Sequence, residues 1–88
     1  MKPKEFERIF KSLANRRRIV AVSCIKRLKE ANVGRIAAEL GLSFPATSRH
    51  LNILEKAGVL EKEQRDREVF YRLARTVPAF IGQFLAEL

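Results

Sequence analysis

Residues 36–63, IAAELGLSFPATSRHLNILEKAGVLEKE, predict two helices joined by a short turn. Gly41 ends the first helix, because glycine readily adopts the left-handed backbone conformation of a tight C-terminal turn. Ser43 is placed to cap the second helix, and Pro45 fits its first turn. Apolar or inward-facing positions recur at helical spacing, at Val33, Ile36, Ala37 and Leu40 and then at Thr47, Leu51 and Leu54. Residues 33–57 therefore match a helix-turn-helix.

Two strand-like runs follow the second of these helices. They are residues 59–64 (VLEKEQ) and 68–73 (EVFYRL), and the second run is rich in β-branched and aromatic residues. The polar connection Arg65-Asp66-Arg67 is consistent with a hairpin turn. A hairpin over residues 59–73, directly after a helix-turn-helix, is the element called a wing.

Further helices are predicted on both sides of this unit. Pro3 opens a helix over residues 3–14, whose apolar stripe is Phe6, Ile9, Phe10 and Leu13. Asn15 is placed to cap a second helix that runs to about Glu30. A last amphipathic helix, residues 76–88, has Pro78 in its first turn. The expected fold is mainly α with a small β-hairpin, a winged helix-turn-helix of order α-α-α-α-β-β-α in one domain, 1–88.

The composition excludes several classes of protein. A chain of 88 residues holds one core, and no apolar run approaches the roughly 20 residues that span a bilayer. The N-terminus lacks the apolar core of a signal peptide, so we expect a cytoplasmic protein with no membrane partner. The single cysteine, Cys24, excludes an internal disulfide framework and a multi-thiolate zinc site. We expect it in the core; the alternative, a sensing thiol, has only Lys26 and Arg27 nearby to support it.

The net charge of +8 is concentrated in the first part of the chain. Residues 1–38 carry eleven Lys and Arg against three Glu, and the remaining fifty residues balance to zero. A small domain this basic indicates a polyanionic partner. A surface charge that only keeps the protein soluble would give the same total.

Three segments, in order and at the right spacing, resemble the ArsR family of winged-helix transcriptional repressors. Residues 10–22, FKSLANRRRIVAV, are similar to the opening of that family. Residues 36–63 are similar to its helix-turn-helix and first wing strand, and 67–73, REVFYRL, to its second wing strand. The resemblance implies DNA binding as a homodimer, with the fourth helix as recognition helix. It also implies, in many members, an effector that releases the DNA.

The sequence departs from the metal-sensing members of this family. Their Cys-x-Cys motif in the third helix would fall at Asn32 and Gly34, and neither is a thiolate. The last helix offers no His, Asp or Cys for the other familiar site, only Glu87 near its end. We therefore expect no metal and no cofactor, and the effector stays unknown.

The first turn of the fourth helix is compact, which suits a helix end that enters a major groove about 12 Å wide. Ser48 can hydrogen-bond to a base edge or a phosphate. Arg49 suits a bidentate contact with guanine, worth about 1–3 kcal/mol of discrimination. Phe44 either contacts a thymine methyl or packs back onto the third helix. The residues expected to contact bases are Ser43, Phe44, Pro45, Ala46, Ser48, Arg49 and Asn52, and Lys56 is also expected to face outward.

Other basic side chains are expected at DNA phosphates or in the adjacent minor groove. They are Arg16, Arg17 and Arg35, with Arg65 and Arg67 at the wing tip. Cations at the start of the second helix oppose the helix dipole, which favours an external anion there. The alternatives are a solvated helix face, with Arg18 bracing the fold, and a hairpin turn in which Asp66 pairs with a neighbouring arginine.

Several polar residues are expected to take no part in DNA binding. His50 lies at the border of the buried face, which indicates a hydrogen-bonded structural histidine rather than a base contact, catalyst or ligand. Lys2, Lys4 and Lys11 are expected on solvated faces.

The last helix is more apolar than a domain of this size requires. We expect its stripe, with part of the first helix, to meet a second copy of the chain. The alternative is that it only covers the core of one chain. Two-fold symmetry would place two recognition helices one DNA turn apart, about 34–36 Å. The expected interface is Phe6, Phe10, Val77, Phe80, Ile81, Phe84, Leu85 and Leu88.

Three other functions compete with a sequence-specific repressor. An enzyme would need a nucleophile with a base, or paired carboxylates in a pocket. The one His and one Cys lie on different predicted helices, so we expect no enzyme. A protein-docking winged helix would share the fold, and a nonspecific nucleic-acid binder would share the charge. Ser48, Arg49 and the wing arginines favour specific DNA binding, while the operator, the regulated genes and the sign of regulation stay open.

Overall fold

The computed structural model describes all 88 residues, which form five helices and a three-stranded sheet. In chain order the elements are α1 (Pro3–Leu13), α2 (Arg16–Leu28), β1 (Glu30–Asn32), α3 (Val33–Leu40), α4 (Phe44–Lys56), β2 (Leu60–Arg65), β3 (Glu68–Leu73) and α5 (Ala79–Ala86). The predicted order of helices and hairpin strands is confirmed, and β1 was not predicted. Each helix is too short or too polar to cross a lipid bilayer.

Local hydrogen bonds fix the turn between α3 and α4. Gly41 has a φ of 66°, and the Leu42 amide donates to the Ala37 carbonyl oxygen at 3.1 Å. The Ser43 side chain then accepts a hydrogen bond from the Ala46 amide at 3.2 Å. The predicted helix end and helix cap are both confirmed. Together they let the chain reverse between two helices within a few residues.

A third strand, β1, joins the predicted hairpin. The sheet is antiparallel, β3 lies between β1 and β2, and Glu30 of β1 pairs with Arg72 of β3. The second helix was predicted to run to about Glu30. That bound was wrong, because α2 ends at Leu28 and Lys29 adopts a left-handed conformation with φ of 74°. A strand of three residues is too short to show a periodic pattern, so nothing local in the sequence indicates it.

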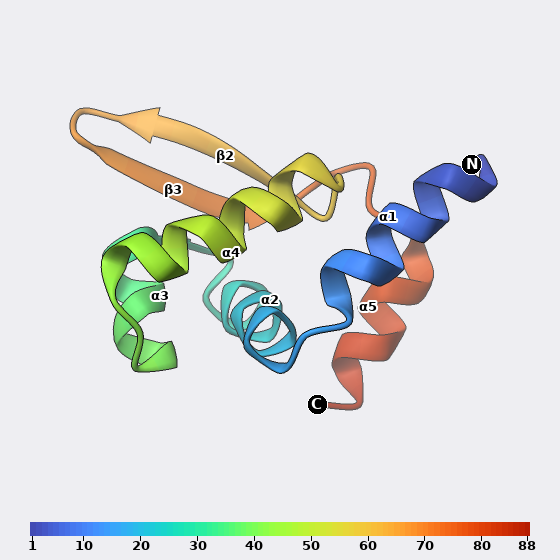
Figure 1. Cartoon of the computed structure of the whole chain (residues 1–88), viewed down its shortest axis with the longest axis horizontal. Coiled ribbons are helices and arrows are strands. Elements are labelled where there is room, and N and C mark those ends of the chain that lie inside the picture. Colours follow the sequence, from blue (N-terminus) through green and yellow to red (C-terminus); the bar gives the residue numbers. More distant parts are fainter.

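Helix α2 lies between the helix-turn-helix and α1 and supplies the centre of the core (Figure 1). Val22 and Ile25 of α2 are 0% exposed, as are Ile36 of α3 and Leu51 and Leu54 of α4. Fifteen buried hydrophobic residues form this one cluster. The packing turns one face of α4 inward, so its opposite face and its first turn lie at the surface.

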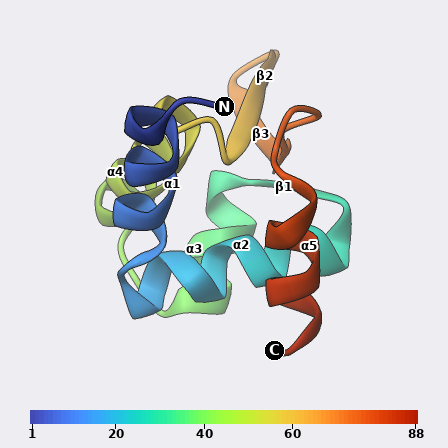
Figure 2. The same ribbon diagram turned by 90° about the vertical axis from the view of Figure 1, so that its right-hand side faces the viewer.

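The wing and the α1–α5 pair lie at opposite ends of the molecule. Figure 1 shows β2 and β3 extending past the first turn of α4 at one end, and Figure 2 looks onto the end formed by α1 and α5. Phe6, Phe10 and Phe80 join these two helices, with ring centroids 6.4, 6.0 and 5.8 Å apart. Helix α5 is shorter than the predicted 76–88, because Pro78 stands at its N-cap rather than inside its first turn.

Gly41→Ala should destabilise the protein by about 1 kcal/mol, because a side chain is strained in the left-handed conformation. The cost is conformational, since nothing lies within 4 Å of an added Cβ. Gly34→Ala is the matched control: Gly34 lies in α3, where an added Cβ has only Asn32 Oδ1 at 3.7 Å. It should leave stability unchanged or raise it by up to about 1 kcal/mol. Urea unfolding at one protein concentration measures both, and equal effects would contradict the role given to the turn.

Candidate nucleic-acid interface

The inner face of α4 fixes the direction of its outer face. Thr47, Leu51 and Leu54 are 0% exposed, and the Thr47 hydroxyl donates to the Ser43 carbonyl oxygen at 2.9 Å. Arg49 lies on the other side of the helix and is exposed. The inward and outward orientations predicted for these residues are confirmed. A helix held this firmly can present one arginine at a defined position.

Phe44 stands at the surface, beside the wing. Its side chain is 59% exposed, so it does not belong to a core. It lines a shallow hollow with Val33 and Gly34 at the start of α3 and with Arg67 of the wing. The first turn of α4 and the wing tip therefore form one continuous surface. Of the other first-turn residues expected to contact bases, Ser43 and Pro45 are exposed, and Ala46 and Ser48 are half-buried.

Asn52 does not face outward as predicted. Its Oδ1 accepts hydrogen bonds from the Tyr71 hydroxyl at 3.2 Å and from Lys62 Nζ at 3.5 Å. Tyr71 belongs to β3 and Lys62 to β2, so Asn52 ties α4 to the sheet. Its oxygen is engaged by the sheet, and contact of Asn52 with a base edge stays a prediction.

Arg18 joins three helices at the end of α1. Its guanidinium donates to the carbonyl oxygens of Ser12 at 2.6 Å and Lys11 at 3.5 Å. Its Nη1 also lies 3.3 Å from Nδ1 of His50 in α4. Because a guanidinium can only donate, His50 Nδ1 must be the acceptor and carry no proton. The bracing role of Arg18 and the structural role of His50 are both confirmed.

The surroundings of His50 favour its neutral form. Burial lowers the pKa of His50 from its ordinary value of 6.5, and the positive charges of Arg18, Arg17 and Arg49 lower it further. The neutral imidazole is the form that can accept from Arg18. The contact between α2 and α4 therefore depends on the neutral form of His50, which the lowered pKa favours.

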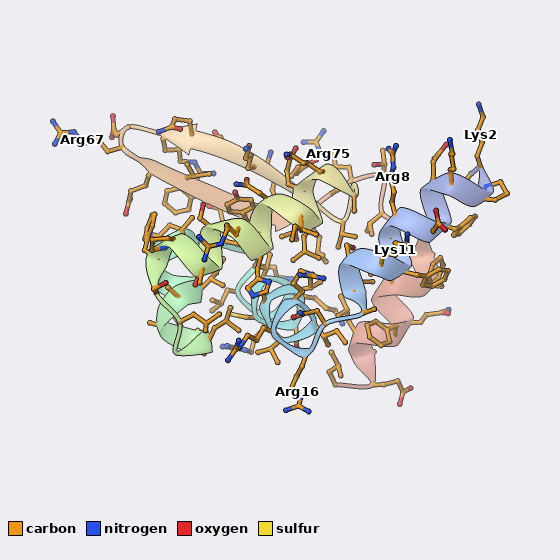
Figure 3. All side chains as sticks on the ribbon, viewed as in Figure 1. Lys2, Arg8, Lys11, Arg16, Arg67 and Arg75 are labelled. Carbon is orange, nitrogen blue, oxygen red and sulfur yellow. The ribbon has the colours of Figure 1, made fainter.

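Three of the arginines expected to bind DNA are free of acidic partners. Arg16 and Arg17 at the start of α2 and Arg67 in the wing turn are exposed, with no carboxylate within 4 Å. Figure 3 shows Arg16 and Arg67 pointing away from the molecule. Arg35 is different, since it lies 3.4 Å from Glu39 on the same helix. Asp66 pairs with neither neighbouring arginine.

Arg65 is not free at the wing tip, and the prediction that it is available to the minor groove was wrong. Its guanidinium donates to both carboxylate oxygens of Glu30 at 2.7 and 2.9 Å and to Glu63 at 2.9 Å. It also lies 4.5 Å from the ring centroid of Phe70. The charge of Arg65 is thus matched by carboxylates from β1 and β2, which leaves Arg67 as the free arginine of the wing turn.

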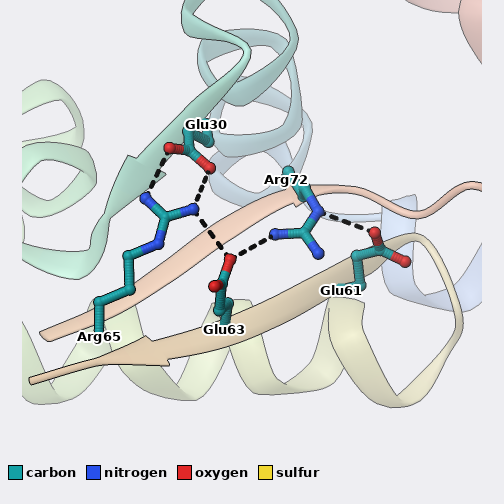
Figure 4. Close-up of polar contacts among 5 residues, drawn as sticks. All are labelled: Glu30, Glu61, Glu63, Arg65 and Arg72. Atoms are coloured by element: carbon teal, nitrogen blue, oxygen red, sulfur yellow. Dashed lines mark hydrogen bonds and ion pairs between the residues drawn. The ribbon is translucent and has the colours of Figure 1, made fainter.

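The Arg65 contacts belong to a larger network on one face of the sheet. Figure 4 shows it continuing through Glu63 to Arg72 and Glu61, at 3.1 and 2.8 Å. Hydrogen bonds from Arg65 lower the pKa of Glu30 and of Glu63, so both carboxylates stay charged at neutral pH. Partly exposed ion pairs such as these contribute little to stability. Their geometric effect is to tie β1, β2 and β3 together and to hold the wing in one direction.

An exposed apolar surface lies at the α1–α5 end. Phe10, Phe84 and Leu88 are 56%, 39% and 64% exposed, and Val20 of α2 is 45% exposed. Phe10 and Phe84 line a groove between α1, α2 and α5 whose lining is entirely hydrophobic. Val20 was not among the residues expected at this surface.

The remaining residues expected at a dimer interface divide into two groups. Ile81 and Leu85 are only 1% and 4% exposed, so the expectation that they meet a second copy was wrong. They cover the core of one chain, which was the alternative explanation for the stripe. Three more of the expected residues are half-buried and can contribute both to the core of one chain and to a dimer interface: Phe6, Val77 and Phe80.

No group of three or more His, Cys, Asp or Glu side chains is gathered as a metal site. Cys24 is free and 5% exposed, so its predicted place in the core is confirmed. Burial raises the pKa of its thiol, although Arg27 lies 3.9 Å from the sulfur. A thiol with a raised pKa is a poor nucleophile at neutral pH.

Two helices joined by a tight turn and followed by a projecting hairpin define a winged helix-turn-helix protein. Comparison with known proteins gives the family. Residues 14–62 match the family described as "Bacterial regulatory protein, arsR family". This chain belongs to the arsR family, and the resemblance found in its sequence is confirmed.

Individual relatives agree with this assignment. The arsenical resistance operon repressor of Escherichia coli is 33% identical over 79 residues, which are 90% of this chain and 68% of that protein. The transcriptional activator HlyU of Vibrio cholerae is 34% identical over 68 residues, which are 77% of this chain and 62% of HlyU. The chain thus spans roughly two thirds of the length of these relatives.

Solved structures confirm the fold. The structure of HlyU from Vibrio cholerae matches with a TM-score of 0.84 at 27% identity, covering 99% of this chain and 96% of HlyU. A solution structure from Mycobacterium bovis, described as the homodimeric winged helix-turn-helix DNA-binding domain of Mb0332, matches with a TM-score of 0.80 at 25% identity. That match covers 96% of this chain and 74% of the Mb0332 chain.

The free energy of unfolding should decrease as the pH falls through His50 titration. The pKa of His50 is lower in the folded protein, so the unfolded chain takes up the proton first, near pH 6.5. The stabilisation is therefore fully present above that pH and is lost as the pH falls toward the lowered value. Chemical unfolding between about pH 7.5 and 5.5 measures the loss. His50→Gln cannot protonate and should show no such loss; the same slope in both proteins would exclude His50 as its source.

Proposed function

We propose that this protein is a sequence-specific regulator of transcription, a repressor that binds double-stranded DNA as a homodimer.

 The observation that carries the proposal is the exposed N-terminal half of α4, which presents Arg49 at the surface and places Phe44 beside Arg67 of the wing. A recognition helix contacts base edges with the residues of its N-terminal end. The fixed inner face of α4 supports the same use, because it holds Arg49 in one orientation.

Each part of this surface suits a different part of the DNA. Arg49 has the geometry for a bidentate contact with guanine O6 and N7, and Phe44 and Pro45 offer apolar surface to a thymine methyl. Arg16 and Arg17 are suited to phosphates, which position the protein without selecting a sequence. Arg67 at the wing tip is suited to the adjacent minor groove.

The apolar α1–α5 end supports a homodimer. Phe10, Phe84 and Leu88 are exposed there, and a contiguous apolar patch of this kind marks a protein interface. Mb0332, described as homodimeric, matches almost the whole of this chain. A two-fold dimer would place two copies of α4 on successive turns of the major groove and would favour a palindromic operator.

Repression is supported by the relative described as an arsenical resistance operon repressor. Activation of transcription also occurs among the relatives, because HlyU is described as a transcriptional activator. A repressor acts by occupying its operator, which needs only the DNA-binding surface and the dimer proposed above. We place the protein in the cytoplasm, where a bacterial regulator meets its DNA.

Selection from random duplex DNA at near-physiological salt should recover a palindromic consensus with half-sites about one helical turn apart. Arg49→Ala should lower affinity for this consensus far more than for unrelated duplex, since the base contact is worth about 1–3 kcal/mol. Arg17→Ala is the comparison and should weaken binding to both duplexes alike. Fluorescence anisotropy with the two duplexes measures the affinities of the wild-type protein and of both variants.

The outcomes separate the candidate functions. Retention of DNA without a consensus would indicate a nonspecific nucleic-acid binder. An Arg49→Ala protein with unchanged preference among sequences would show that α4 is not the recognition helix. Failure to retain any duplex would favour the protein-docking winged helix.

The double variant Phe10→Gln/Phe84→Gln should shift the protein from dimer to monomer in sedimentation equilibrium. The two side chains supply exposed apolar area to the proposed interface, and glutamine removes it without changing the net charge. Affinity for the two-half-site duplex should fall together with the dimer fraction. Ala38→Gln, at an exposed position of α3, is the control and should leave the dimer intact. A double variant that stays dimeric would refute an interface formed by α1 and α5.

A further inference from the structure

A basic groove lies between α1 and the C-terminal part of α4. Its positively charged lining residues are Arg8 and Lys11 of α1, Arg18 of α2 and Lys56 of α4. Ser12, Ile53 and Ala57 complete the lining, and no acidic residue belongs to it. In Figure 3, Arg8 extends from α1 on the side where α4 ends. Four positive charges from three helices therefore surround one concave surface.

The charges of this groove are almost uncompensated. Arg8 and Lys56 have no carboxylate within 4 Å, and Lys11 has only Glu7, at 4.0 Å, with both side chains largely exposed. On the sheet, by contrast, Arg65 and Arg72 each contact two carboxylates. Like charges held together repel, so an anion in the groove would relieve a repulsion that the protein itself leaves in place.

The groove continues the base-contacting face of α4. Arg49, Ile53 and Lys56 are spaced i, i+4 and i+7, which puts them on one side of the helix. At 1.5 Å per residue, Lys56 lies about 10 Å along the helix from Arg49. That length is comparable to the width of the major groove, about 12 Å, so Lys56 can reach the phosphate backbone when Arg49 is at a base edge.

Helix α1 presents two different surfaces. Phe6 and Phe10 lie on the side that meets Phe80 of α5, whereas Arg8 and Lys11 line the groove toward α4. One short helix thus borders both the proposed dimer interface and the end of the recognition helix. In a two-fold dimer built on α1 and α5, this groove would lie near the symmetry axis.

We propose that the groove binds phosphate groups of the DNA backbone and that α1 is part of the DNA-binding surface. Arg8, Lys11 and Lys56 supply the contacts, and Arg18 adds positive charge while its hydrogen bonds hold α1 and α4 in place. The phosphates that the groove binds belong to the DNA between the two half-sites. Lys11, expected from sequence on a solvated face, thereby gains a role. The inference rests on the function proposed above.

The salt dependence of DNA binding tests this inference. With the selected duplex, the slope of log affinity against log salt should decrease in magnitude by about 0.9 for each phosphate contact removed. Arg8→Gln and Lys56→Gln should each produce such a decrease and weaken binding to all sequences equally. Lys26→Gln is the matched control, because Lys26 of α2 is exposed, makes no ion pair and does not line the groove. It should leave the slope unchanged.

A scan of the duplex with single neutral methylphosphonates locates the contact. Wild-type protein should lose affinity at one or two positions between the half-sites, and Lys56→Gln should show no further loss at the position that Lys56 contacts. If Arg8→Gln and Lys56→Gln kept the wild-type slope of log affinity against log salt while the wild type still preferred its selected sequence, phosphate binding by the groove would be refuted. The proposed function would stand. A wild-type protein that binds no duplex would instead refute the proposed function.

Discussion

The guanidinium of Arg18 makes the contact on which the arrangement of the helices depends. The last carbonyl groups of a helix have no partner within it. Arg18 of α2 donates to the carbonyl oxygen of Ser12 at the end of α1 and to that of Lys11, which also accepts from the Ala14 amide. The same planar group reaches His50 on α4. A lysine ammonium carries its three donors on one nitrogen and lacks the planar fork that spreads the donors of a guanidinium. This side chain therefore adds a polar link between the helix proposed for dimerisation and the helix proposed for DNA recognition, which also share the hydrophobic core.

The distribution of acidic residues separates structural from functional arginines. Carboxylates of β1 and β2 neutralise Arg65 and Arg72 on the sheet, whereas none approaches Arg16, Arg17 or Arg67. Arg16, Arg17, Arg49 and Arg67 consequently keep their positive charge available to a ligand, whereas the arginines of the sheet do not. These free charges, more than the net charge of +8, define where a polyanion can bind.

Features set by neighbouring residues were predictable from the sequence, and those set by distant partners were not. The Gly41 turn and the Ser43 cap depend on backbone conformation and hydrogen bonds within a few residues, so composition and spacing were enough. Strand β1 depends on β3, about forty residues away, and has no periodicity of its own. For the same reason the sequence did not show that Arg65 is paired and Arg67 is free, since only the folded sheet brings Glu30 beside Arg65.

Helix α1 shows how one short segment can serve three purposes by facing three ways. Ile9, 3% exposed, packs into the core, while Phe10, its neighbour in sequence, is 56% exposed toward the proposed partner. Arg8, the residue before them, lines the basic groove beside α4. Successive residues of a helix differ by about 100° in direction, so these three surfaces are necessarily coupled. A displacement of α1 at the dimer contact would shift the basic groove as well, and through Arg18 it would reach the recognition helix. The distance between two recognition helices is thus a property of α1 and its neighbours, and not of α4 alone.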